Sequence, residues 1–155
     1  MKTLLKSLAI LIAATGLACA AEKAAKLPKL EWMTDFAAAK EKAKAENKQV
    51  LMNFTGSDWC PWCIKLDKEV LSSPEFNAYA EKNLVLVIVD FPNEKRIKSS
   101  VEKQNKALKE TYNVGGFPTV LVVDDEGKKV GQTGYIEGGP AKWVANLEKV
   151  APPKK

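Results

Sequence analysis

The 155-residue chain contains no histidine. This absence excludes catalysis by a Ser-His-Asp or Cys-His arrangement, because both need an imidazole base, and it excludes histidine-ligated zinc. Cysteine is almost as rare, since only Cys19, Cys60 and Cys63 occur. So few sulfur ligands cannot complete a four-ligand zinc site without carboxylates or a second copy of the chain. We therefore expect neither a metal nor a cofactor.

The sequence also lacks a basic stripe interleaved with aromatic side chains, which a nucleic-acid groove would need. Lysines are concentrated in 40–48, in 95–109 and at the C-terminus, mostly beside glutamates, as on solvated helix faces. A small positive net charge favours solubility and does not indicate a nucleic-acid partner. The length suits a single domain.

The N-terminus has the order of a secretory signal peptide. Two lysines within 1–6 precede an apolar run over 8–17, and small residues follow up to Ala20, after which we expect cleavage. The apolar run is shorter than the roughly 20 residues that span a bilayer. An alternative is a lipoprotein signal with Cys19 lipidated, but Gly16 stands where a lipobox carries leucine. The sequence predicts an exported protein, periplasmic or extracellular, that is attached to a membrane only if Cys19 is lipidated.

The remainder of the chain alternates strand-like and helix-like segments. Continuous apolar runs at 50–54 and 84–90 predict buried strands, and the second run is so rich in β-branched residues that we expect helices on both faces of a parallel sheet. The whole order predicts an α/β, three-layer sandwich with a central mixed sheet flanked by helices. The other expected segments are an exposed leader at 21–29, a strand at 30–33, helices at about 35–47, 60–71, 75–83, 98–112 and 140–150, a hairpin of strands at 119–124 and 129–135, and a frayed tail at 151–155.

Cys60 and Cys63 are separated by Pro61 and Trp62 at the start of a predicted helix. Cysteines with this spacing lie nearly one turn apart, and the unpaired N–H groups and positive dipole of a helix start favour the thiolate. The first sulfur of such a pair is better placed for solvent, so we expect Cys60 to attack a substrate disulfide and Cys63 to resolve the mixed disulfide. The alternative is an inert structural disulfide, although so short a loop would stabilise little.

The surroundings of this pair resemble the thioredoxin superfamily. A buried strand leads to Trp59 and the two cysteines, and Gly-Gly-Phe-Pro-Thr at 115–119 precedes a later strand. The resemblance covers about 30–150. It is strongest to small exported thioredoxin-like proteins with Phe-Thr-Gly-Ser-Asp-Trp-Cys-x-x-Cys-x-x-Leu-Asp, which this chain carries at 54–67. It implies a thioredoxin-like domain for 30–150.

The resemblance also implies a substrate-binding surface. Pro118 would be cis and lie against the cysteines, and the backbone of Phe117 would pair with substrate like an added strand. Trp59 and Trp62 would form an apolar rim that accepts a polypeptide, although either could instead pack locally. Pro61 suits the first helical turn, where its missing N–H costs nothing.

Two positions depart from the thioredoxin pattern. Asn53 stands where thioredoxins carry a buried carboxylate thought to take the proton of the resolving cysteine, so Asp58 or Glu69 would have to substitute for it. Pro61 and Trp62 match neither the Gly-Pro of thioredoxins nor the Pro-His or Gly-His of strong oxidants. Stabilisation of the Cys60 thiolate is therefore left to the helix start.

These features predict an exported thiol–disulfide oxidoreductase that reduces or exchanges disulfides of extracytoplasmic proteins. We expect a monomer that meets protein disulfide substrates and one redox partner, whose identity is open. Two alternatives stay open at this point. One is a disulfide oxidase or isomerase in the same compartment, and the other is a thioredoxin-fold binding module whose cysteines are not essential.

Overall fold

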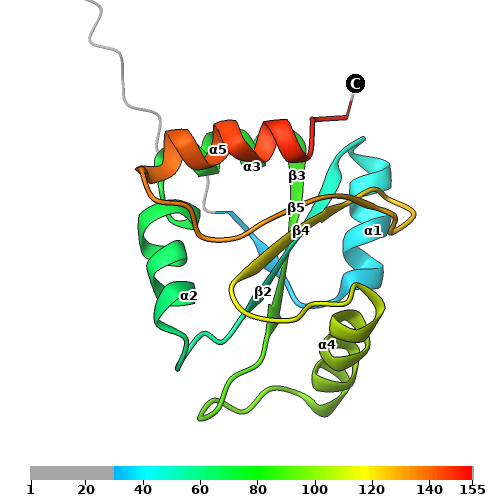
Figure 1. Cartoon of the computed structure of the whole chain (residues 1–155). Coiled ribbons are helices and arrows are strands. Elements are labelled where there is room, and N and C mark those ends of the chain that lie inside the picture. Colours follow the sequence, from blue (N-terminus) through cyan, green and yellow to red (C-terminus); the bar gives the residue numbers. More distant parts are fainter. Residues whose placement is uncertain (1–29, 155) are drawn as a thin grey trace, which may run out of the picture.

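The computed structural model describes residues 30–154, so the signal peptide, Cys19 and the leader predicted for 1–29 lie outside the described residues. The strands and helices alternate in the expected order (Figure 1). None of the helices in this part of the chain is long and apolar enough to cross a membrane. The elements are β1 Trp32–Met33, α1 Phe36–Ala45, β2 Gln49–Thr55, α2 Pro61–Leu66, the π-helical turn η1 Asp67–Leu71, α3 Pro74–Asn83, β3 Leu84–Asp90, α4 Ser99–Thr111, β4 Thr119–Val123, β5 Lys129–Thr133 and α5 Gly139–Val150.

The five strands form one mixed sheet in the order β1-β3-β2-β4-β5. Strand β3 pairs in parallel with β1 and β2, which confirms the parallel, doubly covered strand predicted for 84–90. Strand β4 runs antiparallel to β2, and the hairpin partner β5 runs antiparallel to β4. The central position of β2 places its C-terminal end, from which the cysteine loop departs, in the middle of the sheet.

Side-chain alternation along β2 builds one core on each face of the sheet. Val50, Met52 and Phe54 face the side covered by α1 and α4, whereas Leu51 faces the side covered by α2, α3 and α5 (Figure 1). Trp143 of α5 is fully buried on this second side. The predicted three-layer α/β sandwich is thus confirmed. Asn53 has the same parity as Leu51 and therefore points to the α2 side.

The helix that follows the cysteines differs from its prediction. We expected one regular helix as far as Leu71, but α2 ends at Leu66 and the chain continues as the π-helical turn η1. A π turn inserts one extra residue into the hydrogen-bond ladder, so it rotates the side chains that follow it. The register of the second half of the helix therefore could not be inferred from the spacing of its apolar residues.

The C-terminal tail is packed and does not fray as expected. Ala151 is buried in the core on the α5 side, and the carbonyl of Pro152 accepts a hydrogen bond from Gln49 Nε2 at 3.1 Å. Lys154 forms an ion pair with Asp125 at 2.9 Å. These contacts hold the described tail residues against the start of β2 and the β4–β5 turn.

The two outer strands of the sheet are poorly suited to pairing with another chain. Strand β1 is only two residues long. Strand β5 is largely exposed, carries Lys129 and Gln132, and its register against β4 shifts between Val122 and Val123. It ends at Thr133, so Tyr135, which we placed in the strand, belongs to the following loop.

Candidate active site

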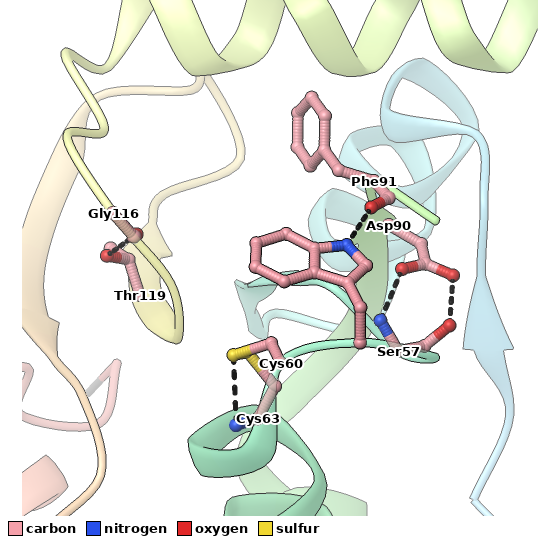
Figure 2. Close-up of a disulfide and its surroundings, with 8 residues drawn as sticks. Ser57, Cys60, Cys63, Asp90, Phe91, Gly116 and Thr119 are labelled. Atoms are coloured by element: carbon pink, nitrogen blue, oxygen red, sulfur yellow. Dashed lines mark hydrogen bonds between the residues drawn. A yellow bond between two sulfur atoms is a disulfide. The ribbon is translucent and has the colours of Figure 1, made fainter. Parts of the chain in front are cut away.

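The cysteine pair lies where the loop after β2 enters α2. Cys60 is the N-cap of α2, with extended backbone, and its Sγ accepts a hydrogen bond from the Cys63 backbone N–H at 3.2 Å (Figure 2). Pro61 occupies the first turn of α2, as expected for a residue without an N–H to donate. The two sulfurs are joined as a disulfide, and the two Cα atoms are 5.2 Å apart. The predicted cysteine pair at a helix start is confirmed.

The two cysteines are buried to nearly the same extent. As whole residues, Cys60 is 4% exposed and Cys63 is 3% exposed. Accessibility therefore does not distinguish the two cysteines. The Cys63 N–H directed at Cys60 Sγ does distinguish them, because a donor beside a sulfur favours its anionic form.

The loop before Cys60 is fixed by hydrogen bonds to the last residue of β3. Ser57 donates its backbone N–H and its hydroxyl to the two oxygens of Asp90, at 3.0 and 2.6 Å (Figure 2). Asn105 of α4, buried and missed in the sequence, donates to the backbone carbonyl of Asp90 at 2.9 Å. The cysteine loop is therefore tied through β3 to the opposite helix layer.

Asp58 anchors the same region from the exposed side. Its carboxylate accepts hydrogen bonds from the backbone N–H groups of Asn93, Glu94 and Lys95 at 2.9–3.1 Å. These bonds, that of Asn93 above all, lower the pKa of Asp58 to about 2. A carboxylate held in this way stays ionised and binds the loop, so Asp58 does not stand in for the titratable group missing at Asn53.

Trp59 is held at the edge of the site. Its indole N–H donates to the carbonyl of Phe91 at 2.7 Å, and its ring meets the edge of the Phe117 ring at a centroid distance of 6.0 Å. Phe91 in turn stacks on Phe117 at 5.0 Å. Trp59 nevertheless keeps 44% of its surface exposed. It therefore combines the two roles left open in the sequence, local packing and an apolar surface beside the cysteines.

Trp62 is the most exposed large apolar side chain near the pair, at 54%. Its ring lies 5.4 Å from that of Tyr135, and the ammonium of Lys65 sits 5.3 and 4.9 Å from the two ring centroids. The hydroxyl of Tyr135 donates to Glu69 at 2.6 Å, and this bond raises the pKa of Tyr135. Glu69 is thus occupied and does not compensate for Asn53.

The loop before β4 completes the site. The Phe117–Pro118 peptide bond is cis, as the resemblance implied. Thr119 donates its hydroxyl to the carbonyl of Gly116 at 2.8 Å, which closes the turn around the proline (Figure 2). Contact between Phe117 and the ring of Trp59 places this turn next to the cysteine loop.

The structure places Phe117, next to the cis Pro118, against Trp59, and the other four residues predicted for the site follow Trp59 directly in the chain. It adds Tyr135, which sequence reasoning missed because Tyr135 reaches Trp62 across more than 70 residues of chain. It also adds a small cavity of about 170 Å³ beside Cys63, which Asn53 and Asp67 help to line. Spacing alone could have pointed to Asp67, because it lies four residues after Cys63 and so on the same helix face.

Comparison with known proteins agrees with this geometry. The family model of the thioredoxin-like domain matches residues 36–151. The disulfide bond reductase DsbH of Chlamydia pneumoniae is 39% identical over 119 residues, which are 77% of this chain and 71% of that protein. The thioredoxin-related protein DsbJ of the same organism is 31% identical over 103 residues, 66% of this chain but only 30% of its own length.

A solved structure of a DsbH oxidoreductase superposes with a TM-score of 0.75 at 38% identity, covering 79% of this chain and 84% of that one. This structural similarity, the family match and the cysteine pair at the start of α2 all indicate the same class of protein. The chain belongs to the thioredoxin-like family and is a thiol–disulfide oxidoreductase, and its Cys60 and Cys63 form a disulfide-capable pair.

Proposed function

We propose that the protein reduces disulfide bonds of other proteins outside the cytoplasm. The observation that carries the proposal is the position of the Cys60–Cys63 pair, at the start of α2 and between two exposed tryptophans. Such a rim suits an unfolded or extended polypeptide better than a small polar disulfide. The name of the similar Chlamydia protein, a disulfide bond reductase, supports the direction of electron flow.

The reaction follows from the two cysteines in their reduced form. The Cys60 thiolate attacks one sulfur of the substrate disulfide, and the other substrate sulfur leaves as a thiolate that takes up a proton. Cys63 then attacks Cys60 Sγ, which releases the second substrate thiol and leaves the disulfide seen in the structure. Two electrons pass to the substrate, and a separate redox partner must return them before the next cycle.

Recognition of the substrate is assigned to the surface around the pair. An extended segment would pair with the backbone of Phe117 beside the cis Pro118, and its side chains would contact Trp59 and Trp62. A cavity of about 560 Å³ beside Trp59 extends this surface toward the 91–97 loop. Lys95 and Arg96 lie there, so the same side offers positive charge to the bound chain.

Export is part of the proposal. The predicted signal peptide at 1–20 would carry the chain out of the cytoplasm and would remove Cys19, leaving Cys60 and Cys63 as the only cysteines. The mature protein would act as a monomer and would be attached to a membrane only if Cys19 were retained and lipidated. Fractionation of cells expressing the full chain, with a Cys19→Ala variant as the control, tests the export and the attachment to a membrane.

Reduction of insulin disulfides in the presence of dithiothreitol tests the activity. The wild-type protein should accelerate the reaction, Cys60→Ser should abolish the acceleration, and Cys63→Ser should accumulate a mixed disulfide with the substrate. Equilibration with thiol buffers then gives the direction: a potential near about −270 mV is that of a reductant, and one near about −120 mV is that of an oxidant. A potential at the oxidising end, or partner capture that survives loss of both cysteines, would refute the proposal.

A further inference from the structure

Two adjoining cavities lie between the cysteine loop and α4. The first, of about 560 Å³, is bordered by Trp59, and the second, of about 400 Å³, extends toward the C-terminal half of α4. Phe91 and Lys106 border both cavities, so the two form one continuous depression beside the cysteine loop. We call this depression the basic groove and define it by Trp59, Phe91, Lys95, Arg96, Lys106 and Lys109.

The basic groove opens at the same end of the sheet as the cysteines. Strands β2 and β3 are parallel, with Thr55 opposite Asp90, so the cysteine loop and the 91–97 loop leave the sheet at the same edge (Figure 1). Trp59 directly precedes Cys60, and its indole N–H donates to the carbonyl of Phe91 at 2.7 Å. A polypeptide whose sulfur reaches Cys60 would therefore have its neighbouring residues at the groove.

The cations of the groove stand on a fixed backbone. Asp58 accepts hydrogen bonds from three successive backbone N–H groups of the 91–97 loop, the last of them that of Lys95. The ammonium of Lys95 lies 3.4 Å from the hydroxyl of Ser57, and that of Lys109 lies 5.8 Å from the centroid of the Phe117 ring. Charges that are already held in place lose less conformational entropy on binding, so the groove is preorganised for an anionic ligand.

Positive charge is concentrated on this side of the molecule. Residues 91–110 carry six basic and three acidic side chains, whereas the rest of the described chain carries twelve basic and fifteen acidic ones. Arg96 is exposed, and within residues 30–154 its guanidinium has no ion pair or side-chain hydrogen bond. The groove thus adds positive charge beside the cysteines to a domain whose remaining surface is slightly acidic.

The acidic groups that border the groove are mostly engaged within the protein. Asp90 accepts a hydrogen bond from the hydroxyl of Ser57 at 2.6 Å, and Glu102 forms an ion pair with Lys106 at 2.7 Å. Glu110 borders only the second cavity. The negative charge around the groove is therefore largely compensated before any ligand binds.

The cation beside Trp62 offers no second site of this kind. Lys65 lies 4.0 Å from the carboxylate of Glu69, and its ammonium sits 5.3 and 4.9 Å from the ring centroids of Trp62 and Tyr135. This charge is compensated and covered by the protein itself. Charge recognition is therefore expected on the Trp59 side.

We propose that the basic groove binds acidic residues that flank the substrate cysteine, so that the protein acts preferentially on disulfides in acidic segments. The inference rests on the proposed function and deepens it by naming the class of substrate. Carboxylates of the substrate meet Lys95, Arg96 and Lys109, and its apolar groups lie on Trp59 and Phe91. An anionic membrane surface would match the charge, but a flat surface does not fill a concave site that is partly aromatic.

Three peptides of equal length test the preference. Each has one central cysteine that carries a thionitrobenzoate group, and glutamates, glutamines or lysines flank the cysteine on both sides. The Cys60 thiolate of the fully reduced protein attacks the peptide sulfur, because thionitrobenzoate is the better leaving group, and the released thionitrobenzoate gives a second-order rate constant. Dividing each rate constant by that measured with dithiothreitol removes the intrinsic reactivity of the peptide.

The glutamate peptide should react at least about fivefold faster than the lysine peptide. The reason is that a groove of one charge sign raises the local concentration of an oppositely charged ligand by about tenfold or more. The preference should shrink at high ionic strength, since the Debye length falls from about 10 Å in 0.1 M salt to about 3 Å in 1 M salt.

Charge variants locate the preference in the groove. Lys95→Gln combined with Arg96→Gln keeps the backbone N–H that Asp58 binds, and it should lower the ratio of the glutamate rate to the lysine rate at least about threefold. Lys95→Glu combined with Arg96→Glu should reverse the preference. Because each ratio is measured on one protein sample, it does not depend on the fraction of the variant that is folded.

The β4–β5 turn provides the matched control. Lys128→Glu combined with Lys129→Glu changes the net charge by the same amount, at two adjacent exposed residues. This turn lies at the opposite end of the sheet from the cysteine loop, because Val123 pairs with Val50 near the start of β2. The control variant should keep the ratio of the wild type.

The outcomes are distinct. Release from none of the peptides by the wild type would refute the proposed function and this inference with it. Equal rates with all three peptides, or a preference that both groove variants retain, would refute only the inference. A preference lost equally in the control variant would belong to the net charge of the protein and would also refute it. If the groove variants keep the peptide preference and instead lose binding to phosphatidylglycerol vesicles, the groove serves a membrane surface and the inference is wrong.

Discussion

Replacing Gly56 with alanine should reveal how firmly Trp59 is held beside the cysteines. A Cβ at residue 56 would overlap the Trp59 ring and stand 2.6 Å from its Nε1. The ring is restrained by its hydrogen bond to Phe91 and its contact with Phe117. Overpacking at such a position costs about 1–3 kcal/mol.

The exposure of Trp59 determines where in that range the cost falls. Because 44% of the side chain is exposed, the ring can relieve the overlap by swinging toward solvent. It then loses the bond to Phe91, which is worth about 1 kcal/mol. We therefore expect Gly56→Ala to lower the free energy of unfolding by about 1–3 kcal/mol. Displacement of the rim should also reduce activity toward protein substrates.

Urea denaturation followed by circular dichroism measures the effect, and Gly115→Ala is the matched control. A Cβ at residue 115 meets no atom within 4 Å, and the backbone there does not have the positive φ that favours glycine. Trp59→Phe, which deletes the indole donor, should account for most of the loss, so that adding Gly56→Ala to it costs less than in the wild type. If Gly56→Ala and Gly115→Ala unfold within about 0.5 kcal/mol of each other, the restraint on Trp59 is not what the contacts indicate.

Three further predictions concern other parts of the molecule. Hydrogen bonds lower the pKa of Asp58 from its ordinary 3.8 to about 2, and the bond from Asn93 has the largest effect. The contribution of the Asp58 carboxylate to stability is therefore present at neutral pH and is lost as pH falls from about 4 through about 2. Asp58→Asn should flatten that part of an acid-unfolding curve, and an identical curve for the variant would contradict this. Tyr135→Ala removes the ring beside Trp62 and should raise KM for insulin several-fold without changing the rate with 5,5′-dithiobis(2-nitrobenzoate); equal losses with both would point to misfolding. Trp143→Ala should cost about 3–5 kcal/mol in urea denaturation, since the ring is fully buried and donates to the Gly134 carbonyl, and a loss below about 1 kcal/mol would be inconsistent with that packing.

The elements that the sequence predicted well are those whose pattern is local. The run at 84–90 is apolar up to Asp90 and rich in β-branched residues, and its pairing on both sides follows from that composition. The helix start at Cys60 follows from the proline that comes after it. Trp143 and Leu147 stand four residues apart, the spacing of one helix face, and both are fully buried. In each case the residue type and its immediate neighbours suffice.

The features that escaped prediction depend on distant parts of the chain or on hydrogen-bond geometry. Tyr135 meets Trp62, and Lys154 meets Asp125, only because of how the helices and hairpin pack. The π-helical turn at Asp67 leaves the apolar spacing almost unaltered and so gives no signal in the sequence. The near-complete burial of Cys60 also escaped prediction, because it depends on the segments that surround the cysteine loop and not on the cysteine motif itself.

The form of the two outer strands has a consequence for the proposed action on unfolded polypeptides. Open sheet edges recruit other strands and promote aggregation, and proteins protect them with short strands, charges and bulges. Here one edge is the two-residue β1, and the other is β5, with its exposed Lys129 and the register shift opposite Val123. A substrate held in extended form is therefore poorly able to form backbone hydrogen bonds with either edge strand. Under the proposed function, such edges would keep the sheet from pairing with substrate chains that have not yet folded.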